Sequence, residues 1–302
     1  MCFTEIMRLG RGRVLGLLML GSGAVAAFLR PEPVVRGLVR LLPFDVLWYV
    51  DTQVRVFALT FDDGPHPDIT PLLLDVLAKH RARATFFVIG ERVAGHEPVV
   101  ARIAAEGHEL GIHLMRDEPS VRLPDAEFRR QLGQVMSLLA PCGDIAWFRP
   151  GSGWFTPRML RSAAQLDLRC VLGTAVALNG GGASDRRIAR RLTRRIRPGS
   201  IVVLHEGTAD RRGVVATTDL ILTELAERGL VAVTVSELTA LSRLTLGSRA
   251  GSRYGVFFRT QGGEILEDLL GRGRPVRGQQ HIELVYPVDQ RLVGVTQWLP
   301  SP

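Results

Sequence analysis

The sequence is poor in three residue types that often indicate function. Its three cysteines form no Cys-x-x-Cys pair, which argues against a zinc site built from paired thiolates. Lysine is nearly absent, since Lys79 is the single lysine among 38 basic residues. Aromatic residues make up only 6% of the chain and no zinc-finger spacing is present, so nucleic acid is not an expected partner despite the basic charge.

What the chain does contain is enough apolar sequence for a sizeable core. Of its 302 residues, 46% are hydrophobic and 23% are charged, which is typical of a globular protein. The length fits one large domain or two small ones. The net charge of +8 comes almost wholly from arginine, which a high-GC genome favours; the alternative is a basic surface that attracts anionic lipid or a teichoic-type polymer.

The first fifty residues have the layout of an export signal. Three arginines precede an uncharged apolar run at 14–29, and Ala-Val-Ala at 24–26 fits a cleavage site. The run is shorter than the roughly 20 residues of a full membrane span, so a cleaved signal and an uncleaved anchor both stay open, as does a buried helix. We expect residues 1–50 to be a signal peptide or membrane anchor with a juxtamembrane segment. The rest of the chain is then exported from a bacterium, as a membrane-anchored, periplasmic or extracellular protein.

From residue 54 onward, apolar runs alternate with helical patterns. The strand-like runs lie at 54–60, 84–89, 110–112, 146–148, 169–172, 200–204 and 230–235. Between them, helical patterns lie at 70–80, 97–105, 124–139, 157–165, 185–196 and 214–228. This alternation predicts an α/β protein of parallel βαβ units, and about seven strands indicate a distorted (β/α) barrel with its chemistry at the carboxyl ends of the strands. We assign 51–242 to the main domain and 243–302 to a small C-terminal extension of unknown role, with strand-like runs at 255–259 and 282–285.

Two adjacent carboxylates, Asp62 and Asp63, end the first of these strands. A Gly-Pro turn comes directly after them and can rotate both side chains toward one cleft. One carboxylate can then hold a cation while the other acts as a base. Taken alone, such a pair is more often an Asx-turn or a helix N-cap, so the functional interpretation depends on polar residues further along the chain.

Three further clusters also fall at predicted strand ends. His113 and Asp117 are four residues apart, which places both on one face if the segment is helical, and with an aspartate they would form a three-ligand site suited to zinc or a similar ion. The alternative for His113 is a hydrogen-bonded core histidine, and the alternative for Asp117 is a helix N-cap or the partner of a neighbouring arginine. His205 lies at the mouth of a buried strand, where a histidine is well placed as a general acid.

The third cluster is rich in glycine and aromatic residues around Arg149. This arginine ends a predicted strand and is able to pair with Asp62. The glycines after it let backbone N–H groups approach a substrate oxyanion, and Trp154 or Phe155 could stack on a sugar ring. The alternative is a glycine-rich connection carrying two core aromatics.

Taken together, four motifs in this order resemble those of polysaccharide deacetylases of carbohydrate esterase family 4. They are Thr-Phe-Asp-Asp-Gly-Pro ending at Pro65, Gly-His-Glu-Leu-Gly-x-His ending at His113, Phe-Arg-Pro around Arg149 and Leu-His-Glu around His205. The similarity covers roughly 54–240. It implies a distorted (β/α) barrel, a divalent metal that is commonly zinc, and removal of acetyl groups from chitin-like sugars, peptidoglycan or xylan.

The resemblance also implies roles for individual residues. Asp62 matches the catalytic base, Arg149 the arginine that supports it and His205 the catalytic acid. Asp63 and His113 match metal ligands, and Asp117 stands where a second metal-binding histidine is usual. We expect the substrate to be contacted by the segment after Arg149, with the Ser152 backbone N–H near the oxyanion; its predicted substrate-binding residues are Pro150, Ser152 and Trp154.

Two departures from the family pattern bear on these roles. An Asp–His–Asp site is harder and of lower net charge than an Asp–His–His site, which weakens Lewis acidity and shifts preference away from zinc. The stretch 171–179 also lacks the carboxylate with which the family orients its catalytic histidine; Glu206 and Asp185 are the substitutes nearby. The sequence therefore predicts a metal-dependent deacetylase of N-acetylated amino sugars in a polysaccharide or oligosaccharide. The alternatives are a catalytically silent glycan-binding relative and a membrane-associated structural protein.

Overall fold

The computed structural model describes residues 45–177 and 185–241, together with four strands in the C-terminal region, at 258–260, 263–265, 280–288 and 291–299. The predicted signal or anchor at 14–29 lies outside these residues. Within the described part of the chain, no helix has the length and apolar character needed to cross a membrane.

A single parallel sheet of nine strands forms the centre of the fold, in the order β1-β6-β5-β4-β3-β2-β8-β7, with β9 also pairing with β2. The strands are β1 (Val46–Leu47), β2 (Val56–Gly64), β3 (Thr85–Val88), β4 (Glu109–Ile112), β5 (Trp147–Phe148), β6 (Arg169–Val171), β7 (Ala175–Val176), β8 (Ile201–His205) and β9 (Val231–Val233). The expectation of about seven strands is corrected to nine. The two additional strands, β1 and β7, have two residues each, too few to give an alternating sequence pattern; β5 is equally short, but the Phe-Arg-Pro motif marks its end.

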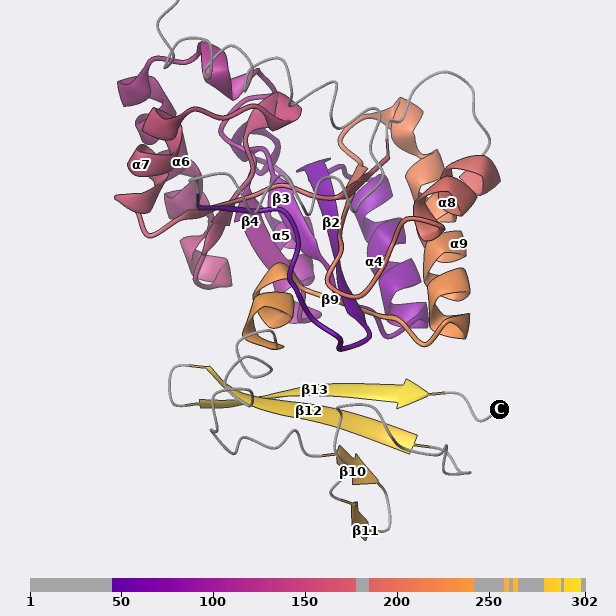
Figure 1. The fold of residues 1–302 in the computed structure, drawn as a ribbon. Coiled ribbons are helices and arrows are strands. Elements are labelled where there is room, and N and C mark those ends of the chain that lie inside the picture. Colours follow the sequence, from indigo (N-terminus) through magenta and orange to yellow (C-terminus); the bar gives the residue numbers. More distant parts are fainter. Residues whose placement is uncertain are drawn as a thin grey trace, which may run out of the picture.

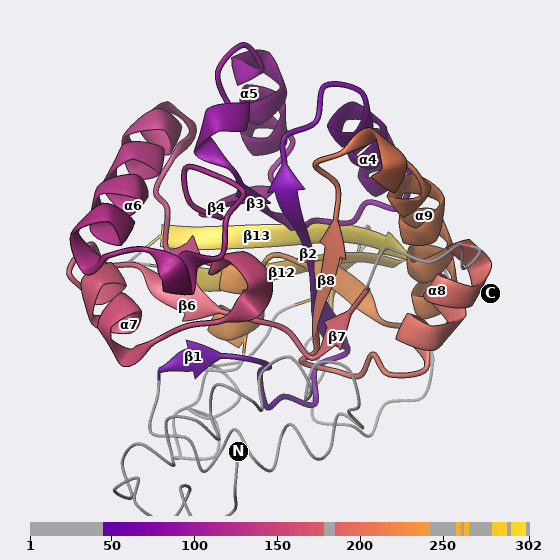
Figure 2. The same ribbon diagram turned by 90° about the horizontal axis from the view of Figure 1, so that it is seen from above.

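The sheet curls into a half-barrel, and β1 and β7 stand at its two edges. Helices surround it in an arc, which is clearest from above (Figure 2). They are α4 (Ile69–Lys79), α5 (Glu97–Ala105), α6 (Asp125–Leu139), α7 (Pro157–Ala164), α8 (Asp185–Thr193) and α9 (Gly213–Glu227). All six were expected from the sequence. The start of α7 is well specified, because Thr156 Oγ1 accepts from the Met159 N–H at 3.2 Å and Pro157 occupies the first turn.

Strand β2 divides the core into two layers. Its nine residues are all buried, and alternate side chains point to opposite faces of the sheet. Phe57, Leu59 and Phe61 pack in the larger cluster with the helices, whereas Val56 and Ala58 belong to a second cluster inside the curl. The inward series continues along the strand through Thr60 to Asp62. The first predicted carboxylate is therefore the last member of an inward-facing row.

The described part of the C-terminal region consists of two small antiparallel sheets, which lie below the parallel sheet in Figure 1. One pairs β10 (Phe258–Thr260) with β11 (Gly263–Ile265), and the other pairs β12 (Gln280–Val288) with β13 (Arg291–Leu299). The predicted run at 282–285 falls within β12. The run at 255–259 overlaps β10 only at its end, and its first residues lie outside the described part of the chain.

Candidate active site

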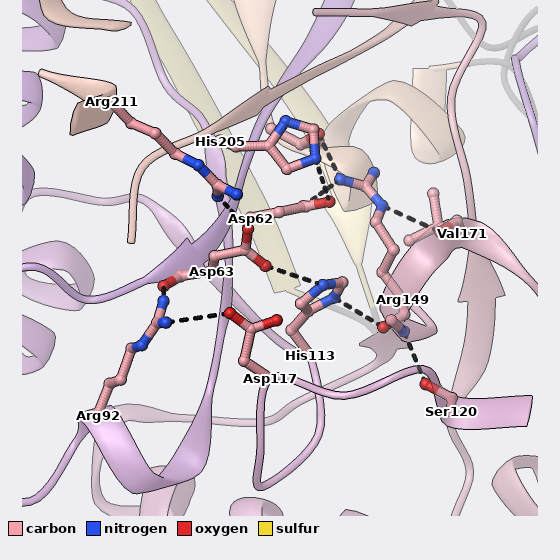
Figure 3. A network of polar contacts seen from close by, with 12 residues as sticks. Asp62, Asp63, Arg92, His113, Asp117, Ser120, Arg149, Val171, His205 and Arg211 are labelled. Carbon is pink, nitrogen blue, oxygen red and sulfur yellow. Dashed lines mark hydrogen bonds and ion pairs between the residues drawn. The ribbon is translucent and has the colours of Figure 1, made fainter. Parts of the chain in front are cut away.

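The predicted catalytic residues converge at the carboxyl end of the parallel sheet (Figure 3). Asp62 ends the regular pairing of β2 and lies directly opposite His205 of β8 in the parallel register. His113 comes after β4, and Arg149 comes after β5. These side chains come from strands far apart in the sequence, and the sheet brings them together because carboxyl ends of parallel strands share one edge.

Arg149 is the buried partner of Asp62. Its Nη1 lies 2.5 Å from Asp62 Oδ1 and 2.7 Å from Thr60 Oγ1, and its side chain is 3% exposed. The other guanidinium nitrogens donate to the backbone carbonyls of Val171 and Leu172, at 3.2 and 3.4 Å. A buried arginine with this many acceptors is held in one orientation, so it fixes the direction of the Asp62 carboxylate.

His205 faces the same carboxylate from the other side. Its Nε2 lies 3.9 Å from Asp62 Oδ2, which is beyond hydrogen-bond distance. Burial disfavours the charged imidazolium and lowers the pKa of His205 below its usual value, although the nearby carboxylates oppose this shift. Asp62 is thus flanked by one guanidinium and one imidazole at the inner end of β2.

Asp63 turns away from the strand and meets His113. Its backbone φ is +69°, in the left-handed region, as is that of Leu114 directly after His113. His113 Nε2 lies 3.1 Å from Asp63 Oδ1, and His113 Nδ1 donates to the Arg149 carbonyl at 2.9 Å. A leucine rarely adopts this conformation. The surrounding structure therefore holds the backbone of both Asp63 and Leu114 under strain.

The charges of this pair reinforce each other. Burial alone would raise the pKa of Asp63, but its contacts with His113 and Arg211 outweigh burial and bring the pKa well below its usual range. Burial likewise disfavours the charged form of His113, yet the hydrogen bond to Asp63 raises the pKa of His113. Asp63 is an anion at neutral pH, as a metal ligand must be.

Two arginines approach these carboxylates from loops. Arg211, at the end of a short 3-10 turn (Ala209–Arg211) after β8, contacts Asp63 Oδ2. Arg92, which closes a similar turn (Gly90–Arg92) after β3, donates to the Asp63 backbone carbonyl and lies 3.1 Å from Asp117 Oδ2. Sequence reasoning missed both arginines. Their position on loops at the carboxyl ends of strands was the available signal, because such loops build the sites of barrel folds.

Asp117 does not lie where helical spacing would place it. Residues 113–117 are not helical, so the argument that His113 and Asp117 share a helix face does not hold. The Asp117 side chain is 54% exposed and is paired with Arg92. Among the residues that the structure describes, no group of three or more histidines, cysteines or carboxylates is arranged to hold a metal ion. Asp117 as a third ligand stays a prediction.

The remaining two predicted ligands fit a divalent metal. A carbonyl can only accept, so His113 Nδ1 carries a proton, and Nε2, which faces Asp63, is the nitrogen that can ligate once it has lost its own proton. The 3.1 Å between His113 Nε2 and Asp63 Oδ1 is close to the ~3.3 Å that tetrahedral bonds of about 2.0–2.1 Å would give. Asp63 and His113 would hold such an ion.

The predicted substrate-binding residues lie on the loop after β5. Pro150 is buried, Ser152 is exposed with a backbone φ of +64°, and Trp154 is half-buried. The loop is held by the Gly151 N–H, which donates to Ser120 Oγ at 2.7 Å. Phe155 packs partly against the larger core cluster, so of the two aromatics Trp154 is the better placed to meet a sugar. Contact with substrate remains a prediction for all three residues.

Glu206, one of the two substitutes for the missing carboxylate, instead lies beneath the Asp62–Asp63 turn. It is fully buried, and its Oε2 accepts from Thr70 Oγ1 at 2.5 Å. Its Oε1 has no hydrogen-bond partner among the described residues. Burial raises the pKa of Glu206 to about 8. Asp185, the other substitute, lies against Gly213 at the start of α9.

Comparison with known proteins agrees with this geometry. The family model for polysaccharide deacetylase matches residues 49–171. A peptidoglycan-N-acetylglucosamine deacetylase of Bacillus cereus is 32% identical over 196 residues, covering 64% of this chain and 92% of the relative. A chitooligosaccharide deacetylase of Rhizobium leguminosarum bv. phaseoli is 37% identical over 156 residues, covering 49% of this chain and 67% of the relative.

Solved structures give the same result. A crystal structure of a peptidoglycan N-acetylglucosamine deacetylase matches with a TM-score of 0.62 and 27% identity, covering 65% of this chain and 92% of that one. A family 4 acetyl xylan esterase from Clostridium thermocellum, in complex with a cobalt ion, matches with a TM-score of 0.58 and 27% identity. The match covers 62% of this chain and 91% of that one. The chain belongs to the polysaccharide deacetylase family, carbohydrate esterase family 4.

Proposed function

We propose that this protein is a metal-dependent hydrolase that removes acetyl groups from N-acetylated amino sugars of peptidoglycan or chitooligosaccharides. The observation that carries the proposal is the convergence of Asp62, Arg149 and His205 at one edge of the sheet, beside the Asp63–His113 pair. The peptidoglycan and chitooligosaccharide deacetylases among its relatives support the substrate class.

The protein's own groups supply base and acid. Asp62 takes the proton from the attacking water, with its carboxylate held in place by Arg149. His205 gives a proton to the leaving amine. Because burial lowers the pKa of His205, its protonated form is a stronger acid but is less populated at neutral pH. The Ser152 backbone N–H would stabilise the developing oxyanion.

A divalent cation would be held by Asp63 and His113, where it would polarise the acetyl carbonyl and make water more acidic. The cobalt bound by the xylan esterase relative supports a divalent ion. Zinc is our choice among such ions, because an imidazole and a carboxylate are both common zinc ligands. Asp117 is the predicted third ligand.

We further propose that the protein acts outside the cytoplasm. The charged start and uncharged run of the first fifty residues support export, with or without cleavage, and a cell-wall substrate lies on that side of the membrane. Fractionation of cells that make a C-terminally tagged chain tests this. Recovery of the tag in the cytoplasm alone would contradict it.

Acetate release from chitooligosaccharides and from peptidoglycan tests the activity. Asp62→Asn keeps the shape of the side chain but removes the base, so we expect the rate to fall by a factor on the order of 10²–10⁴. Asp68→Asn changes an exposed aspartate six positions along the same segment and serves as the matched control. We expect this control to match the wild type.

Two results would contradict the proposal. Equal acetate release by the wild type and Asp62→Asn would remove Asp62 as the base. Retention of the glycan by the wild type with no acetate released from either substrate would favour the catalytically silent alternative.

A further inference from the structure

Both oxygens of the Asp63 carboxylate are engaged within the chain. Oδ1 faces His113 Nε2 at 3.1 Å, and Oδ2 is paired with Arg211. Asp117, the predicted third ligand, is paired with Arg92 through Oδ2 at 3.1 Å. Each carboxylate that a metal would use is therefore already paired with a guanidinium (Figure 3).

The local fold makes room for one of these guanidinium groups. Arg92 reaches over the segment after β8 to donate to the Asp63 carbonyl. A side chain at Gly207 would collide with Arg92 and with Asp63, and the φ of +50° at Gly207 also favours glycine. The contact thus depends on a glycine at this position as well as on the reach of the partly buried Arg92 side chain.

The negative charges of Asp63 and Asp117 are already balanced by the two arginines before any ion enters. Asp63 and Asp117 carry two negative charges, and Arg92 and Arg211 carry two positive ones. A guanidinium does not lose its proton in proteins, so it can make way for a divalent ion only by moving. The side chains of Arg92 and Arg211 are 22% and 26% exposed, so each has a path to solvent.

We propose that Arg92 and Arg211 determine the affinity of this protein for a divalent cation, because the ion binds by exchange with their guanidinium groups. At Asp63 the ion takes the place of the Arg211 guanidinium, and at Asp117 it takes the place of the Arg92 guanidinium. This inference rests on the proposed metal-dependent function and adds to it two residues that set the strength of metal binding.

Titration of the full-length protein with Co²⁺, monitored by visible absorption and calorimetry, tests the proposal. We expect Arg211→Gln and Arg92→Gln to bind Co²⁺ more tightly than the wild type. In the wild type the ion has to break a charge-assisted contact that each glutamine variant lacks, so we expect a gain on the order of 10–100-fold. Arg212→Gln is the matched control, since Arg212 is exposed, adjacent to Arg211 and outside the cluster. We expect it to bind like the wild type.

Thermal unfolding separates this role from a purely structural one. Without metal, Arg211→Gln leaves the buried Asp63 carboxylate without its guanidinium, so we expect a lower Tm than in the wild type. Saturating Co²⁺ should then raise the Tm of Arg211→Gln by more than it raises that of the wild type. A purely structural arginine would lower the Tm without tightening Co²⁺ binding.

The proposal is overturned if both variants bind Co²⁺ no more tightly than the wild type, or if none of the four proteins binds it. Acetate release is measured on the same wild-type preparation. An active wild type with unchanged Co²⁺ affinity in the variants would therefore overturn the role of the arginines and leave the proposed hydrolase intact.

Discussion

Glu206 shows how one buried residue links the site to the stability of the protein. Its carboxyl group supports the turn that carries Asp62 and Asp63, and its backbone N–H donates to the Asp62 carbonyl at 3.0 Å. A Cβ atom at Gly64 would overlap the Glu206 carboxyl, so the two are in close contact. Burial raises the pKa of Glu206 from 4.5 to about 8, so this group is neutral in the folded protein at pH 7.

The raised pKa predicts a pH dependence of stability. Below pH 4.5 the carboxyl is protonated in both the folded and the unfolded chain. Between pH 4.5 and about 8 the unfolded chain releases this proton while the folded chain keeps it, so the free energy of unfolding falls. The loss should be on the order of a few kcal/mol and level off at higher pH. Chemical denaturation between pH 5 and 9 measures it.

The glutamine in Glu206→Gln cannot ionise, so we expect this variant to lose that part of the pH dependence. Its free energy of unfolding should rise relative to that of the wild type as pH increases from about 5 to about 8. Glu227→Gln changes an exposed glutamate at the end of α9 and should keep the wild-type dependence. If Glu206→Gln showed the same fall in stability as the wild type, the carboxyl would not be the titrating group.

At the scale of elements, sequence reasoning succeeded where an element is long or ends in a motif. The nine residues of β2 gave a clear apolar run, and the two carboxylates at its end pointed to the site. It failed for β1 and β7, which owe their existence to neighbouring strands and not to their own pattern. It also failed for Arg92 and Arg211, since the sequence does not show where a long side chain on a loop will reach.

Helix α8 carries an unusual concentration of positive charge. Five arginines on and just after it are exposed and have no ion pair or side-chain hydrogen bond among the described residues: Arg186, Arg187, Arg190, Arg191 and Arg194. Within the helix, Arg190 lies four residues from Arg186 and three from Arg187, and like charges at these spacings destabilise a helix. The helix is maintained by its buried side, where Ala189 and Leu192 pack in the core.

Arg190→Glu should stabilise the protein. The change removes two like-charge pairs and creates two opposite-charge pairs, while it loses a favourable cation from the last turn of the helix. We therefore expect a net gain of about 0.5 kcal/mol in the free energy of unfolding at low salt. Urea denaturation measures the gain, which should shrink in 1 M salt because these side chains are exposed. Arg190→Gln, which only removes repulsion, should give a smaller gain. A glutamate variant no more stable than the glutamine variant would contradict the explanation.

At the scale of the whole molecule, one side chain connects the site to the architecture. Arg149 comes directly after β5, pairs with Asp62 of β2 and donates to the carbonyls of Val171 and Leu172 at the end of β6. Its guanidinium also lies 4.1 Å from the centre of the Phe87 ring of β3. The arginine therefore spans the inside of the curled sheet, and the position of the base depends on the sheet keeping its curvature.

The architecture also predicts which part of the chain is needed for activity. Every residue of the candidate site lies between Thr60 and Arg211, and β9 supplies the last strand that pairs with β2. We expect a chain that ends at residue 242 to release acetate at the rate of the full-length protein and to unfold at the same temperature.

A chain that ends at residue 228 loses β9 and uncovers Val56 and Ala58 of β2, so it should lose its cooperative thermal transition. Circular dichroism and acetate release on both chains test this. A chain ending at 242 that folds but releases no acetate would show that residues 243–302 contribute to the site.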